Sequence, residues 1–144
     1  MSTPAHIVDG FHGTRNKACV TKIGQLVTTP FRYDETEFKE LAVNDTAYNF
    51  YSPKHEQQFV ITGIVAVGDQ QITANSNADV VVYEATAPDT TTVEKVLFQT
   101  AIARDSFQGL PSLNILVNKG VWINAKTTDD DVHMTIMGYY IPEL

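Results

Sequence analysis

The chain carries side chains that catalysis and metal binding use, but their spacing matches none of the common arrangements. Its four histidines, His6, His12, His55 and His133, form no HxH, HxxxH or HExxH pair. His6 and His12 are six residues apart and would need a distant third ligand to hold zinc. We therefore expect no metal and no cofactor.

Three consecutive carboxylates, Asp129 to Asp131, look at first like part of a calcium loop. Calcium loops of the EF-hand type need ligands at alternating positions, a central glycine and a distal glutamate. A strand-like pattern follows directly over residues 132–139, so the three aspartates are better interpreted as a polar hairpin turn. Calcium binding there is the less favoured alternative.

Enzymatic chemistry is not expected either. The sequence contains no GxSxG elbow, no P-loop and no GxGxxG, and no feature marks Cys19 as a reactive thiolate. Trp122 beside Asn118 and Asn124 could form a platform for a sugar. The favoured alternative is that Trp122 packs in the core or at a subunit contact, where large aromatic side chains contribute most.

The elements that would position these residues are strands. Residues 121–126 and 132–141 alternate in polarity with period two, and residues 113–141 predict three strands in succession. Residues 78–85 predict a strand with Val80 and Val82 on one face and Val81 and Tyr83 on the other. Two apolar faces indicate a central strand, or one that another subunit covers.

Other segments extend this pattern. Gly63, within the β-branched run 57–68, predicts a bulge or a bend that crosses between sheets. Residues 38–43 fit a helical turn as well as a strand, and we favour the strand. Residues 104–112 are interpreted as a connection. About eight to ten strands predict an all-β fold, an antiparallel two-sheet sandwich, most economically a jelly roll.

The length of the chain limits the number of domains that it can form. The 144 residues suit one domain of ordinary size. We expect an extended N-terminal arm with the first short strands over residues 1–33 and the β-sandwich over residues 34–144. A single cysteine excludes an intramolecular disulfide and suits folding in a reducing cytoplasm. No apolar stretch approaches the ~20 residues that span a membrane, so no membrane partner is expected.

The net charge of −7 is divided unevenly along the chain. Residues 1–33 carry four cations and one acid, and residues 34–144 carry six cations and sixteen acids. The basic segment could meet an acidic surface, including the body of a neighbouring copy; scattered solvated residues are an equal alternative. An acidic body argues against nucleic-acid binding, which needs clustered lysine and arginine.

Two stretches, NDTAYNFYSP and LNILVNKGVWINAKTTDDDVHMTIMGYYI, resemble a family of small β-proteins from the structural gene clusters of tailed bacteriophages. With the QFVIT strand, the resemblance covers roughly residues 44–67 and 79–141. The family is similar to capsid decoration, or cement, proteins, which are jelly-roll homotrimers on the outside of the head. The resemblance implies the major capsid protein and a second copy as partners and carries over no catalytic residue.

Strand alternation and the role that the resemblance implies together give expectations for particular residues. Tyr139 and Tyr140 point to opposite faces of one strand, so at least one lies away from its own core. The capsid-binding arm is expected to use Ile7, Val8, Phe11, Arg15 and Lys17, and the subunit interface Val81, Tyr83, Trp122 and Tyr139. The alternative is another virion β-module, such as a head fibre, a tail protein or a receptor- or glycan-binding protein.

Overall fold

The computed structural model describes residues 35–70, 72, 76–129 and 131–142. These residues form strands joined by turns and loops. The strands are β1 (Glu35–Leu41), β2 (Tyr48–Tyr51), β3 (Gln57–Gly68), β4 (Asn77–Ala85), β5 (Lys95–Ala103), β6 (Phe107–Leu110), β7 (Ile115–Leu116), β8 (Trp122–Thr127) and β9 (Val132–Pro142). The predicted arm over residues 1–33 lies outside the described residues.

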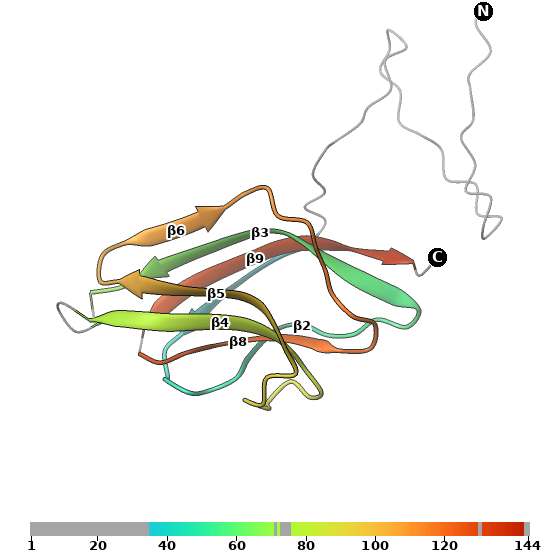
Figure 1. Ribbon diagram of the computed structural model, residues 1–144, viewed down its shortest axis with the longest axis horizontal. Coiled ribbons are helices and arrows are strands. Elements are labelled where there is room, and N and C mark those ends of the chain that lie inside the picture. The colour runs from blue at the N-terminus through green and yellow to red at the C-terminus, as the bar shows by residue number, and fades with distance from the viewer. Residues whose placement is uncertain (1–34, 71, 73–75, 130, 143–144) are drawn as a thin grey trace, which may run out of the picture. The chain divides into compact units, whose positions relative to one another are not determined.

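The strands form two antiparallel sheets that pack face to face (Figure 1). One sheet has the order β1-β9-β3-β6, with β7 also paired to β3, and the other has the order β2-β8-β4-β5. This arrangement confirms the predicted all-β sandwich of two antiparallel sheets. The chain changes sheet at most of its connections, which is consistent with a jelly roll.

The core lies between the sheets and consists of the inward side of each strand. Alternate residues of a strand point to opposite faces, so every second side chain enters this layer. Fully buried members of the core include Leu41, Ile61, Ile64, Val80, Val82, Ile123, Ala125, Met134 and Ile136. The predicted strands over 78–85, 121–126 and 132–141 are therefore confirmed. In the first of them, the core face is that of Val80 and Val82.

Two local predictions are settled by the pairing of β9. Residues 35–41 form the strand β1 rather than a helical turn, because the whole segment pairs with β9, from Glu35 opposite Gly138 to Leu41 opposite Val132. The glycine in β3 marks a bulge and not a crossing between sheets. Both sides of the bulge, at Ile61 and Gly63, pair with β9.

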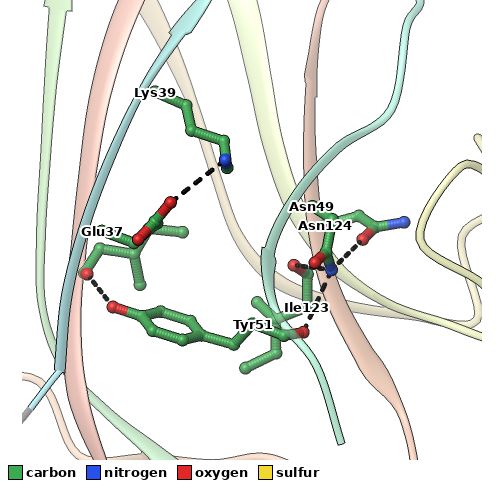
Figure 2. Close-up of polar contacts among 7 residues, drawn as sticks. Glu37, Lys39, Asn49, Tyr51, Ile123 and Asn124 are labelled. Atoms are coloured by element: carbon green, nitrogen blue, oxygen red, sulfur yellow. Dashed lines mark hydrogen bonds and ion pairs between the residues drawn. The ribbon is translucent and has the colours of Figure 1, made fainter.

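One end of the core is aromatic and joins the two sheets directly. The ring of Tyr51 in β2 stacks on Phe59 in β3, with 4.2 Å between centroids, and Phe59 meets the ring of Tyr140 edge-on at 4.8 Å. The Tyr51 hydroxyl donates a hydrogen bond to the backbone oxygen of Ile136 in the opposite sheet (Figure 2). The Tyr140 hydroxyl donates to the backbone oxygen of Ser52 at 2.7 Å.

This burial predicts a loss of stability in alkali. Desolvation raises the pKa of Tyr51 and raises that of Tyr140 to about 12. Unfolded tyrosines ionise near pH 10, so this contribution is fully present below pH ~10 and is lost as pH rises toward 12. We expect urea midpoints to fall between pH 9 and pH 11, and Tyr140→Phe to weaken that fall. If the urea midpoint of Tyr140→Phe depends on pH as that of the wild type does, ionisation of Tyr140 does not cause the loss of stability.

Two glycines provide a matched test of packing. A Cβ at Gly138 would lie 2.2 Å from the backbone oxygen of Val60 and 2.5 Å from the ring of Phe59, whereas at Gly109 the nearest atom is 4.0 Å away. Gly138→Ala should therefore lower the free energy of unfolding by about 1–3 kcal/mol, because the core must shift. Gly109→Ala should leave it nearly unchanged. Equal urea midpoints for the two variants would show that the close approach is not a constraint.

Candidate functional site

A sandwich has two outer faces, and in this protein they differ sharply. We call the outer face of the sheet β2-β8-β4-β5 the covered face; its side chains include Val81, Tyr83, Val96, Trp122, Asn124 and Lys126. We call the outer face of the sheet β1-β9-β3-β6 the open face; its side chains include Phe38, Val60, Val65, Val67, Phe107, Leu116, Thr135, Met137 and Tyr139.

The covered face is sealed by the protein's own β4–β5 loop, residues 86–94. Asn124 in β8 is completely buried beneath this loop. Its side-chain nitrogen donates hydrogen bonds to the backbone oxygens of Ala87 and Thr90, at 2.9 and 3.3 Å. Its side-chain oxygen accepts a hydrogen bond from the Asn49 amide at 3.0 Å (Figure 2). Asn124 thus connects strand β2 to the loop.

Two further side chains hold the same loop. The Tyr83 hydroxyl donates to the backbone oxygen of Thr90 at 2.8 Å, and the Lys126 ammonium donates to that of Thr91 at 3.1 Å. Lys126 also lies 5.8 Å from the centre of the Tyr83 ring. Tyr83 is completely buried, and this burial raises the pKa of its hydroxyl. The apolar outer side of β4 is therefore covered within the subunit.

A buried carboxylate closes the adjacent end of the sandwich. Glu84 is 2% exposed and accepts hydrogen bonds from the backbone nitrogen and the side-chain nitrogen of Asn118, at 2.9 and 2.8 Å. The Lys95 ammonium lies 3.6 Å from the same carboxylate. These contacts fix the loop that leads into β8, and they use the Asn118 amide.

The open face has no equivalent cover among the described residues. Phe107 is 78% exposed, Phe38 59%, Leu116 51% and Val67 40%. They come from four different strands, so they form a surface across the sheet rather than along one edge. Phe107 pairs with Val67, and Val67 pairs with His133, in one cross-strand row. Exposed apolar side chains gathered on one face commonly mark an interaction site.

One end of the open face is charged. The His133 Nε2 atom lies 3.7 Å from Asp69 Oδ2 and 4.0 Å from Glu40 Oε1. The Phe38 ring meets the imidazole edge-on, with 5.9 Å between centroids. A protonated His133 would attract both carboxylates, whereas a neutral one leaves two negative charges beside an apolar surface. The open face is thus apolar with an acidic end.

The residues predicted for a subunit interface are divided between the two faces. Val81, Tyr83 and Trp122 lie on the covered face, and Tyr139 lies on the open face of the other sheet. Tyr83 presents no surface to a partner, and Val81, Trp122 and Tyr139 are half-buried. The predicted arm residues Ile7, Val8, Phe11, Arg15 and Lys17 lie outside the described residues, so their role stays a prediction.

The structure also places the side chains considered for sugar binding. Trp122 is half-buried, but Asn124 is completely buried and Asn118 donates to Glu84. The three side chains therefore share one end of the sheet without presenting their amides together to a ligand.

Sequence reasoning missed most of the open face. Residues 104–112 were interpreted as a connection, but they contain the strand β6 and Phe107. This prediction was wrong because β6 has only four residues and includes Gly109, so alternation is too short to be recognised. In β3, Val65 and Val67 alternate with the buried residues Ile64 and Ala66. This pattern indicates a strand with two apolar faces and could have predicted part of the open face.

Within the described part of the chain, no three histidine, cysteine, aspartate or glutamate side chains gather closely enough to hold a metal ion. The same residues contain no helix long and apolar enough to cross a membrane. Comparison with known proteins gave no match: no family model, no curated protein and no solved structure matches the chain.

The loop contacts generate a prediction about Asn124. Asn124→Ala removes the hydrogen bonds to Ala87, Thr90 and Asn49, although Thr90 keeps its bond from Tyr83. Asn49 keeps its bonds to Tyr51 and Ile123. We expect a loss of about 1–3 kcal/mol in the free energy of unfolding and faster hydrogen exchange over residues 87–91. Lys126→Ala, which removes an exposed contact, should have a smaller effect on both. If Asn124→Ala leaves hydrogen exchange over residues 87–91 unchanged, the Asn124 side chain does not hold the loop in place.

Proposed function

We propose that this chain is a structural virion protein, a capsid decoration or cement protein of a tailed bacteriophage. It would bind the outer surface of the head as a homotrimer and stabilise the shell, after synthesis in the host cytoplasm. Its partners would be the major capsid protein and further copies of itself. The observation that carries the proposal is the open face, an exposed apolar surface on one sheet, whereas a loop of the same chain lies over Tyr83 and Asn124 on the other sheet.

The physical requirements of that role agree with the fold. A shell filled with DNA bears internal pressure, and a protein bound across several shell subunits adds contact where separation would begin. Such a protein needs a rigid scaffold and adhesive surface. Burial of apolar surface contributes roughly 25 cal/mol per Å² before the costs of association are subtracted. The β-sandwich supplies the scaffold, and the open face supplies apolar surface through which copies can associate around the shell.

The sequence resemblance supports the same proposal. It covers most of β2, β3, β4, β8 and β9, which include the central strands of both sheets. The alternative, another virion β-module such as a head fibre, tail or glycan-binding protein, is favoured only by Trp122, whose side chain is half-buried on the covered face.

Copy number distinguishes these two functions. A decoration protein should bind purified heads of the encoding phage in a fixed stoichiometry to the major capsid protein. A fibre, tail or receptor-binding protein should be present in few copies per particle. Quantitative mass spectrometry of virions, with cryo-microscopy of heads incubated with the protein, measures both. Few copies, or no density on the heads, would exclude a decoration role.

Deletion of residues 1–16 tests the predicted arm. This change removes Ile7, Val8, Phe11 and Arg15 but leaves the described sandwich intact. We expect the truncated protein to keep its oligomeric state and to lose affinity for heads. The matched control is Arg15→Gln with Lys17→Gln, which removes only the charges and should weaken head binding at low salt. A truncated protein that still coats heads with full affinity would show that the arm does not bind the capsid.

A further inference from the structure

The open face has a more specific use than general adhesion. We propose that it is the surface through which copies of this chain bind one another, so that its occupant is a second copy. This inference rests on the homo-oligomeric part of the proposed function and identifies the face involved. It places the main contact between subunits on the open face, and not at Val81, Tyr83 and Trp122 as the sequence predicted.

The covered face cannot serve the same purpose without a rearrangement. Its central aromatic, Tyr83, is completely buried, and the loop over it is held by hydrogen bonds from Tyr83, Asn124 and Lys126. Docking there would bury mostly loop backbone and threonine side chains. Val96, 48% exposed, is the most exposed large apolar side chain of this face within the described residues.

The apolar area of the open face suits a stable contact. An aromatic side chain can bury roughly 150–250 Å², so Phe107 at 78% exposure and Phe38 at 59% together leave roughly 200–350 Å² in solvent. Leu116 and Val67 add to this area. A standard interface buries about 800 Å² per partner, of which a little over half is apolar. The four exposed side chains therefore supply most of the apolar surface that such a contact needs.

The shape of the open face also suits contact with a second copy of the chain. Phe107 projects from β6, while two residues along the same strand Gly109 leaves space, because the atom nearest to a Cβ there is Val65 Cγ2 at 4.0 Å. The side chains of Phe107 and Gly109 share one face of β6. In a ring of three, the projection of each copy can enter the hollow of the next copy, which is the heterologous type of contact that closes a ring.

Charge also favours a second copy. Glu40 and Asp69 form the acidic end of the open face, and His133 is the titratable base between them. Residues 34–144 carry sixteen acids against six cations, whereas residues 1–33 carry four cations against one acid. A second copy thus brings positive charge of its own toward an acidic body.

Sedimentation velocity of the full chain over a range of concentrations tests the inference. We expect the wild-type protein to be an oligomer. Phe107→Glu and Leu116→Glu, which each place a carboxylate on the open face, should raise the dissociation constant at least ~tenfold, because a large buried apolar side chain contributes 1.5–3 kcal/mol. Val96→Glu makes the same change at an exposed valine on the other sheet and should leave the constant unchanged.

Circular dichroism and urea midpoints establish that each variant folds, and hydrogen exchange over 107–117 gives a second readout. In the wild type these amides should become more protected as concentration rises. A wild-type protein that stays monomeric at high concentration would overturn the inference, as would dissociation caused only by Val96→Glu. Head binding is measured separately: an oligomer that dissociates as expected but ignores heads would support this inference and exclude the decoration function.

Discussion

A strand that is apolar on both faces must be covered twice, and this requirement shapes the whole molecule. In a two-layer sandwich each sheet covers one face of the other, and the second face of each sheet needs a different solution. The sheet β2-β8-β4-β5 receives its cover from the loop 86–94 of the same chain. The sheet β1-β9-β3-β6 has no such cover in the described residues, and its outer face carries Phe38, Phe107 and Leu116 in solvent.

The two solutions differ in their chemistry. The cover over β4 and β8 is held by directed hydrogen bonds, from Asn124 to Ala87 and Thr90 and from Tyr83 to Thr90. Buried polar groups are tolerated only when paired, so these bonds fix one loop position. The open face offers mainly apolar contact, which is less directional. The first arrangement is suited to a permanent intramolecular contact, and the second to a partner that arrives later.

Sequence patterns predicted the sandwich because its central strands alternate over many residues. The alternation in β8 and β9 identified their core sides correctly, and the two apolar faces of β4 indicated a central strand. The cover of Tyr83 could not be predicted, because Asn124 and Ala87 are 37 residues apart and no local pattern relates them. Strand β6 was missed because it is short, and β1 was ambiguous until its pairing with β9 decided it. Apolar content alone therefore located the strands but not what lies over them.

The hydroxyl of Tyr51 affects how the two sheets resist a force that would slide one over the other. Apolar contact between two sheets resists their separation but only weakly opposes sliding, since one set of close contacts can replace another. The bond from Tyr51 to the Ile136 carbonyl joins β2 in one layer to β9 in the other. Sliding would break it inside a dry interior, where neither group could find water as a substitute. One phenol thereby gives the stacked layers a preferred lateral alignment.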